Sequence, residues 1–186
     1  MESINYLALI RGINVGGKNI IKMDELKRTF LELEFSDVET YIQSGNVLFR
    51  DYEKSKINLT KRIEKKLSEK LSNEIKVVVY GISEIEEIIK DIPKNFGKDT
   101  ENFKFDVIFL VEPLRPNELM DKIQVKQDKD VIYVGSRSFY VKRSTEKLRG
   151  SYITEILKIT KNITVRNLET TKKLYELMLK REREKR

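Results

Sequence analysis

The order of strand-like and helix-like patterns in the first half of the chain limits its fold more than any other feature. Tyr6 to Ile10 is a continuous apolar run that is typical of a buried strand, and a helical stripe follows from about Met23 to Glu34. The pattern then predicts strands over Val38–Gln43, Val47–Arg50 and Ile75–Tyr80 and a helix over Ile57–Leu71. The order βαββαβ predicts a ferredoxin-like arrangement, in which two helices cover one face of a four-stranded antiparallel sheet.

The second half repeats this order without repeating its residues. Its strands are expected over Phe105–Val111, Val131–Val134, Phe139–Val141 and Thr164–Val165, and its helices over Asn117–Ile123, Leu148–Ile159 and Leu168–Arg181. The predicted fold class is therefore α+β, with two ferredoxin-like halves, antiparallel sheets and a C-terminal helix.

Pro93, Asn95 and Gly97 interrupt the chain between the two halves, after an expected helix over Ser83–Asp91. With 186 residues, the chain is long enough for one domain or for two small ones. We therefore predict a first half over residues 1–92, which holds the glycine loop described below, and a second half over residues 93–186.

The composition excludes several kinds of active site. The chain has no Cys and no His, so it lacks thiolate nucleophiles, Ser-His-Asp and Cys-His arrangements and the usual ligands of structural zinc. Any chemistry has to use carboxylates, Lys, Tyr, Ser or Thr, or a hard cation such as magnesium held by oxygen atoms. No motif indicates a cofactor or a metal site.

The charge and hydropathy limit the partners. Thirty-seven Lys and Arg residues against 30 Asp and Glu residues give a formal net charge of +7, which weakly favours anionic partners. The basic segment Lys180–Arg186 is typical of a solvated helix end. No segment approaches the ~20 apolar residues that span a bilayer. The residues before the first apolar run include Glu2 and lack the basic region that begins a signal peptide. We therefore expect a cytoplasmic protein with no membrane partner.

A glycine-rich loop follows the first strand and is the leading candidate for a site. Its three glycines let the backbone of residues 11–19 bend sharply and approach a ligand closely. Gly12 to Lys18 nearly matches the phosphate-loop pattern GxxxxGK[ST], but Asn19 replaces the hydroxyl residue and residues 19–22 separate the loop from the helix. The candidate residues of the loop are Arg11, Asn14, Gly16, Gly17, Lys18 and Asn19.

Two interpretations of this loop stay open. Gly16 and Gly17 can form a concavity of amide groups that binds anions, with positive charge added by Arg11 and Lys18. Alternatively, the glycines only provide positive φ angles, and the asparagines of the loop only satisfy backbone groups.

The same choice applies to two other segments. Gln43, Ser44 and Asn46 could bind a ligand, but they also fit a tight hairpin turn between two strands. Arg166 and Asn167 form an unusual polar pair before the last helix, where Asn167 could bind a ligand or serve as the N-cap of that helix.

Three segments of the chain are distinctive sequence motifs: ALIRGINVGGKN over residues 8–19, TYIQSGNVLF over residues 40–49 and TVRNLETTKKLYEL over residues 164–177. Together with Met23 and Leu26, they resemble an uncharacterised bacterial family, domain of unknown function 1697. The resemblance implies an α+β fold of ferredoxin-like parts and no particular activity. It also suggests that the glycine loop, the hairpin turn and the Arg166 segment belong together. The closing stretch matches at Arg166, Asn167, Thr170, Lys173 and Leu174.

The chain departs from that family at several positions. Glu34 stands where the family usually has Gly, so the preceding helix has to end without a left-handed glycine. Leu168 stands where the family often has an aromatic residue, and Thr171 stands where it has Val. The family's Ser-basic-Leu motif is met only loosely by the segment from Arg143 to Leu148.

Three kinds of function are compatible with this sequence. The first is a binding module for an anionic ligand such as nucleic acid, which the net charge and a fold shared by many RNA binders favour. The second is an enzyme that acts on a small phosphorylated or carboxylated substrate, with Arg11 and Lys18 stabilising charge and Asn14 orienting the substrate. The third is a scaffold that binds another protein through a sheet edge or the last helix.

Overall fold

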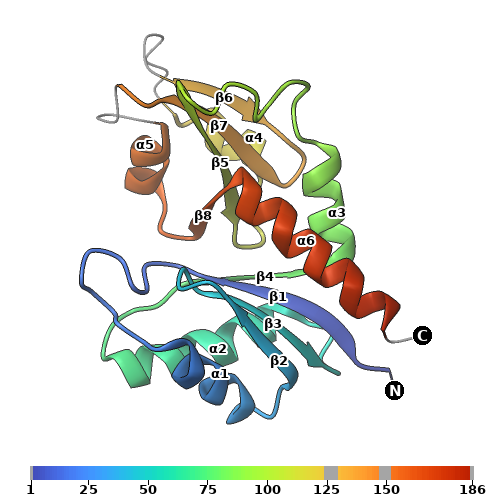
Figure 1. Cartoon of the computed structure of the whole chain (residues 1–186). Coiled ribbons are helices and arrows are strands. Elements are labelled where there is room, and N and C mark those ends of the chain that lie inside the picture. The colour runs from blue at the N-terminus through green and yellow to red at the C-terminus, as the bar shows by residue number, and fades with distance from the viewer. Residues whose placement is uncertain (1, 124–129, 147–151, 185–186) are drawn as a thin grey trace. The chain divides into compact units, whose positions relative to one another are not determined.

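The structure is a computed structural model of the whole chain, and it describes residues 2–123, 130–146 and 152–184. The chain divides into two compact units, each with a four-stranded sheet that is visible in Figure 1. The first unit comprises Met1–Ser83 together with Leu174–Arg186, and the second comprises Glu84–Lys173.

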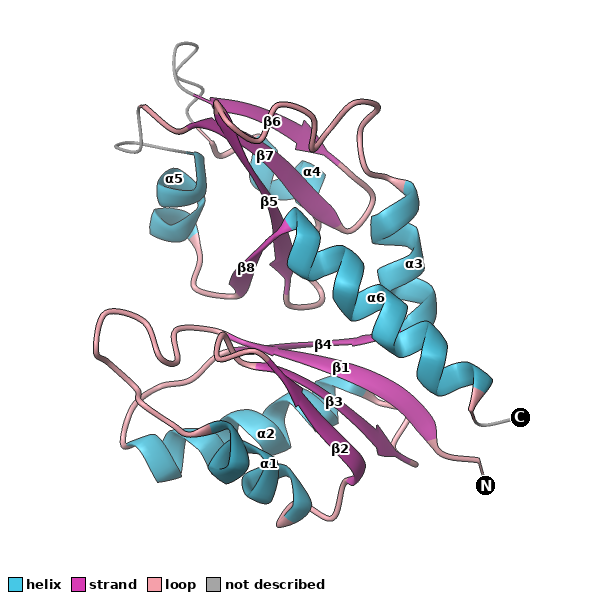
Figure 2. Ribbon diagram, in the orientation of Figure 1, coloured by secondary structure: helices cyan, strands magenta, loops and turns pink. Residues whose placement is uncertain are grey.

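The first unit has the predicted βαββαβ order and the predicted ferredoxin-like fold. Its sheet has the strand order β2-β3-β1-β4, and every neighbouring pair is antiparallel. Helices α1 and α2 lie on one face of this sheet (Figure 2). The elements are β1 (Ile4–Ile10), α1 (Met23–Leu31), β2 (Ser36–Tyr41), β3 (Asn46–Asp51), α2 (Lys56–Leu71) and β4 (Val77–Gly81).

The sheet of the first unit buries apolar side chains on both of its faces. Alternate residues of β1, including Tyr6, Ala8 and Ile10, pack in a core with α1 and α2. The intervening residues Leu7 and Leu9 point to the opposite face and are also buried. This sheet is therefore covered on both sides, unlike an antiparallel sheet with one solvated face.

The C-terminal segment packs on that opposite face. Asn5 Nδ2 donates to Glu182 Oε1 at 2.5 Å, and Arg50 Nη2 donates to the carbonyl oxygen of Arg181 at 3.0 Å. The Arg181 guanidinium is itself buried and pairs with Asp37 Oδ2 at 2.8 Å and with a carboxylate oxygen of Glu39 at 3.4 Å. The prediction of a solvated helix end is therefore wrong for Arg181, because acidic side chains of β2 hold it against the sheet.

Two boundaries in the first unit differ from the predicted ones because non-glycine residues adopt positive φ angles. Helix α1 ends at Leu31, and Glu34 then takes a φ of 64°, in the left-handed region that glycine adopts most readily. Strand β2 ends at Tyr41 rather than Gln43, because Ile42 begins the turn with a φ of 48°. Positive φ is uncommon for a β-branched residue, so the sequence pattern could not indicate it.

The second unit has the same architecture, with the strand order β6-β7-β5-β8. Its elements are α3 (Ile82–Lys90), β5 (Phe103–Leu110), α4 (Pro116–Met120), β6 (Asp130–Val134), β7 (Ser138–Ser144), α5 (Tyr152–Ile159) and β8 (Ile163–Asn167). Helix α6 (Leu168–Arg183) begins in the second unit, and its residues from Leu174 onward belong to the first. The predicted start of the fifth helix at Leu148, and the end of the Ser-basic-Leu motif, lie outside the described residues. In the described ranges, no helix is both long enough and apolar enough to cross a membrane.

Helix α3 is attached to the hairpin of β6 and β7 by polar contacts. The buried Tyr140 hydroxyl donates to the carbonyl oxygen of Ile88 at 2.5 Å. Asp91 Oδ2 accepts hydrogen bonds from the backbone N–H of Ser136 at 2.7 Å and from its hydroxyl at 2.6 Å. These contacts fix the hairpin turn and leave Tyr140 without access to water.

We expect the second unit to lose stability between about pH 10 and pH 12. Burial raises the pKa of Tyr140 to about 12, whereas an unfolded tyrosine has a pKa of about 10. The stabilisation is complete below the unfolded pKa and is lost as the pH rises through the folded pKa, because the unfolded chain releases its proton first. The loss should be of the order of 2 kcal/mol by pH 12.

Urea unfolding of the wild type and of Tyr140→Phe across this pH range is the measurement. The variant loses the hydroxyl and should therefore show a smaller fall in the free energy of unfolding above about pH 10. An equal fall in both proteins would contradict this assignment to Tyr140.

Candidate functional site

The glycine loop forms a small hairpin of its own, which we call the glycine hairpin (residues 12–19). Val15 and Lys18 form an antiparallel bridge, and the N–H of Lys18 donates to the carbonyl oxygen of Val15 at 3.1 Å. Gly16 and Gly17 lie at its tip with φ angles of 59° and 74°, the pair of positive values that a type I′ turn requires. A Cβ atom at either glycine would meet no atom within 4 Å, so conformation rather than crowding requires glycine there.

The two asparagines of the loop hold it in place. Asn14 Oδ1 accepts from the N–H of Ile21 at 2.9 Å, while Asn14 Nδ2 donates to the carbonyl oxygens of Ile21 and Gln43, both at 3.0 Å. Asn19 Nδ2 donates to the carbonyl oxygen of Gly12 at 3.0 Å. Both residues have positive φ angles, of 55° and 49°. The structural interpretation therefore accounts for both asparagine side chains.

The glycine hairpin and the turn between β2 and β3 pack against each other. The N–H of Ile10 donates to the carbonyl oxygen of Gly45 at 2.8 Å, and Gly45 lies directly against Ile13. The buried Asn46 donates from Nδ2 to the carbonyl oxygen of Tyr41 at 3.0 Å and to Ser44 Oγ at 2.9 Å. Two motifs that lie some thirty residues apart in the sequence thus meet at one end of the sheet.

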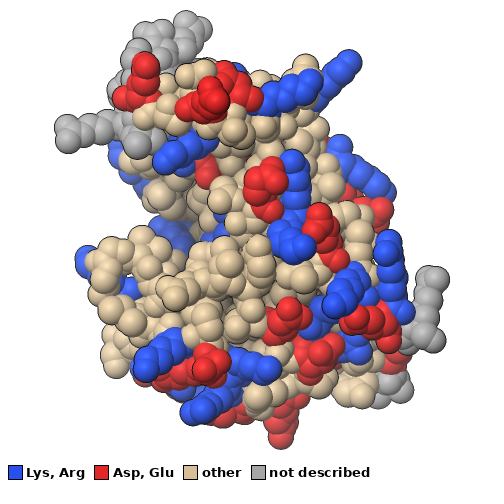
Figure 3. Space-filling view, viewed as in Figure 1, with Lys and Arg blue, Asp and Glu red and all other residues tan. Residues whose placement is uncertain are grey.

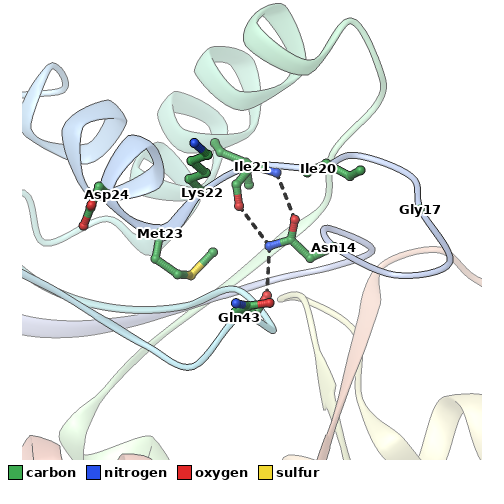
Figure 4. A pocket seen from close by; sticks show the side chains of 8 residues that line it. All are labelled: Asn14, Gly17, Ile20, Ile21, Lys22, Met23, Asp24 and Gln43. Carbon is green, nitrogen blue, oxygen red and sulfur yellow. Dashed lines mark hydrogen bonds between the residues drawn. The ribbon is translucent and has the colours of Figure 1, made fainter.

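A pocket of about 500 Å³ opens beside this junction, and we call it the hairpin pocket. Figure 4 shows the amide of Asn14 in its wall, bonded to Ile21 and to Gln43. The lining residues are Asn14, Gly17, Ile20, Ile21, Lys22, Met23, Asp24 and Gln43. The pocket thus joins the glycine hairpin, the adjoining turn and the first residues of α1.

The polar groups of the hairpin pocket differ in how they are used. Asn14 is occupied by the three hydrogen bonds described above. In the part of the chain that the structure describes, the side chains of Lys22 and Gln43 have no hydrogen-bond or ion-pair partner. Lys22 also occupies the N-cap position of α1, where its side chain makes no capping hydrogen bond. Two residues of the lining, Lys22 and Gln43, thus carry an ammonium group and a primary amide that no described residue binds.

The family assignment rests on the first 140 residues. The model of the family described as "Protein of unknown function (DUF1697)" matches residues 4–140. The chain belongs to the DUF1697 family. The matched range contains the glycine hairpin, the turn between β2 and β3 and every residue that lines the hairpin pocket. It ends before Arg166.

A solved structure has the same fold as this DUF1697 protein. It is the conserved bacterial protein SP0830 from Streptococcus pneumoniae, with a TM-score of 0.80 and 25% sequence identity. The similarity covers 95% of this chain and 99% of SP0830. A search of curated proteins gives no match.

Several predicted site residues of the DUF1697 chain lie outside the lining of the hairpin pocket. Of the predicted set, the lining includes Asn14, Gly17 and Gln43. Arg11 lies outside the lining, and burial lowers the pKa of its guanidinium. The nearby charge of Glu74 opposes that shift. The predicted residues outside the lining are Arg11, Gly16, Lys18, Asn19, Ser44, Asn46, Arg166 and Asn167.

Sequence reasoning missed Lys22 and Asp24. The sequence gives one weak indication of a ligand at this helix start. The N-cap position directly before the predicted start of α1 at Met23 holds Lys22 and not Ser, Thr, Asp or Asn. A helix start that lacks a side-chain cap leaves backbone N–H groups for another partner.

Arg166 and Asn167 belong to the second unit. Asn167 Oδ1 accepts from the N–H of Thr170 at 2.7 Å and thereby caps the start of α6. Arg166 is buried and donates from Nη1 to Thr164 Oγ1 at 2.8 Å and to the carbonyl oxygen of Val165 at 2.7 Å. Its burial lowers the pKa of the guanidinium to about 10.

Within the described ranges, no group of three or more acidic side chains could hold a metal ion.

Proposed function

We propose that this DUF1697 protein binds a small anionic ligand in the hairpin pocket. The observation that carries the proposal is the pair of side chains without partners in the described residues, Lys22 and Gln43, in one pocket. An ammonium group and an amide N–H₂ group are both donors that suit a carboxylate or a phosphate. Asn14 binds the backbone of Ile21 and of Gln43, which reduces the ordering that a ligand would have to impose on this wall.

The position of the pocket at the start of α1 also supports an anion. The first N–H groups of a helix have no partner within it, and the helix dipole favours negative charge there. Asp24 is the acidic side chain of the lining, and it lies at the opposite end from Gly17 (Figure 4). We assign Asp24 to accept a hydrogen bond from a hydroxyl or amino group of an organic anion.

A nucleic-acid surface has less support than this pocket. RNA-recognition motifs stack bases on the open face of the sheet, but Leu7, Leu9 and Leu48 on the corresponding face are buried here. On the face drawn in Figure 3, basic and acidic side chains are interspersed rather than gathered in one basic stripe. We therefore favour a compact ligand over a polymer.

Thermal unfolding with inorganic phosphate as the probe tests the proposal. At a phosphate concentration about ten times the dissociation constant, binding should stabilise the protein by about 1.4 kcal/mol and raise its Tm by about 3–6 °C. Chloride at the same ionic strength serves as the reference, because it removes the effect of screening. Lys22→Ala should weaken binding about tenfold, since it removes the charged donor.

Lys61→Ala is the matched control. Lys61 is an exposed residue of α2 outside the pocket lining, so this variant loses the same charge without changing the pocket. Equal phosphate affinity in the wild type, Lys22→Ala and Lys61→Ala would show that the hairpin pocket is not the site.

A further inference from the structure

The edge strands of the two sheets differ in how they are protected. Strand β2 is an edge with charged residues, a register shift and a left-handed Asp37 (φ 49°), features that discourage pairing with another chain. The side chains of the edge strands β4 and β8 are mostly buried. Strand β6 is different, because Val131, Tyr133 and Val134 are 48%, 39% and 41% exposed. Apart from Asp130 at its start, it is an apolar edge, and it has no register shift and no left-handed residue.

The backbone groups of β6 point alternately toward β7 and toward the open edge of the sheet. The N–H of Gly135 donates to the carbonyl oxygen of Ser138 at 2.9 Å, so Gly135 faces β7. Residues of a strand alternate in this respect, so Ile132 and Val134 direct their N–H and C=O groups away from β7. In the described residues, these groups of Ile132 and Val134 have no partner. As far as the described residues determine it, this edge is open to another strand.

We propose that β6 pairs antiparallel with β6 of a second copy of this chain, about a twofold axis through Ile132. This register extends the sheet of the second unit from four strands to eight. It places Val131 opposite Tyr133 of the second copy, and the symmetry makes the same pair twice. Pairs of an aromatic and a β-branched residue are among the favourable cross-strand contacts of antiparallel sheets.

The charges near β6 fit a second copy. Each chain carries a formal net charge of +7, so two copies repel at long range, and a contact surface without cations adds no further repulsion. Val131 to Val134 carry no charge, although 36% of the chain is charged. Lys142, next to Val131 on β7, is held with its ammonium group 3.6 Å from the ring centre of Phe103 on β5, one strand further from the edge.

Tyr133 is oriented for this contact by the aromatic cluster beneath it. Its ring lies 5.9 Å from that of Phe96, which in turn contacts Phe105 at 4.9 Å and Tyr140 at 5.8 Å. A tyrosine that is fixed before binding loses little conformational entropy on association, which suits an interface anchor. Tyr133 thus provides a fixed and partly exposed ring at the centre of the proposed interface.

The small size of the edge predicts a weak dimer. Strand β6 has only five residues, so it can bury less surface than the ~800 Å² on each partner that is typical of a stable interface. Association should therefore be reversible, with a dissociation constant on the order of 10 μM to 1 mM. The oligomeric state should change with concentration rather than stay fixed.

Sedimentation velocity of the full chain over a range of concentrations is the test. Val131→Lys and Tyr133→Glu should each raise the dissociation constant of the dimer at least tenfold, because each change occurs twice in the interface. The double variant Val131→Lys/Tyr133→Glu should dimerise nearly as well as the wild type, because the twofold register places each new Lys opposite a new Glu.

Ile57→Lys is the matched control, because it puts the same charge on an exposed β-branched residue of α2. It should leave the dissociation constant unchanged, and thermal unfolding checks that each variant is folded. A wild type that stays monomeric throughout, or an equal response to Ile57→Lys and Val131→Lys, would overturn the proposal. A folded double variant that stays as weak as the single ones would overturn the twofold register.

Discussion

Replacing Gly45 with alanine is expected to destabilise the protein by about 3 kcal/mol. Gly45 has a φ of 77°, and a Cβ atom there would lie 2.8 Å from Ile13 Cδ1 and 3.1 Å from Ile10 Cβ. The left-handed conformation costs a non-glycine residue about 1–2 kcal/mol, and forcing a methyl group into packed surroundings costs about 1–3 kcal/mol. Urea unfolding followed by far-ultraviolet circular dichroism measures the loss.

Gly16→Ala is the control that separates these two contributions. Gly16 also has a positive φ angle, of 59°, but a Cβ atom there would meet nothing within 4 Å. It should therefore lose only about 1 kcal/mol. If the two variants lost equal stability, the close packing of the glycine hairpin against the turn at Gly45 would be contradicted.

Replacing Phe49 with alanine is expected to cost about 3–5 kcal/mol, the largest effect among these predictions. Phe49 is fully buried in the core of the first unit. Its ring centre lies 5.6 Å from that of Tyr6, 5.5 Å from that of Phe30 and 4.5 Å from that of Phe35. The truncation would remove a ring from this cluster and leave a cavity among side chains that cannot fully collapse.

Phe49→Leu keeps most of the volume and should lose less than half as much stability. Urea unfolding of both variants is the measurement. Similar losses in both would show that the aromatic contacts, rather than the filled volume, determine the stability at this position.

The order of the elements could be predicted from the sequence because each strand and helix carries its own local pattern. Tyr6 to Ile10 and the stripe through Leu26 and Phe30 indicate their elements without any knowledge of the partner. The position of the C-terminal segment had no such signal, because the contacts of Arg181 with Asp37 and Glu39 join residues more than 140 positions apart. A charged segment in isolation is typical of a solvated helix end, and only the tertiary fold supplies its acidic partners.

The candidate site could be predicted only in part. Glycines and asparagines indicated where the chain forms a loop, but the pattern could not distinguish asparagines that hold a loop from asparagines that bind a ligand. Asn14 makes three hydrogen bonds within the protein, and its partner Gln43 lies in a turn that the sequence could not place beside it. Lys22 follows two isoleucines and belongs to no motif, so its position in the pocket follows from the path of the chain into α1.

An NMR titration with inorganic phosphate tests the proposed anion site most directly, because it reports on each amide of the folded protein separately. The backbone amides of Gly17, Lys22, Met23 and Asp24 and the side-chain amide of Gln43 should shift together with a single dissociation constant. Lys22→Ala should weaken that response, and Lys61→Ala should not. Shifts that are confined to the lysines of α2, or the absence of any saturable shift in the hairpin pocket, would contradict the proposed function.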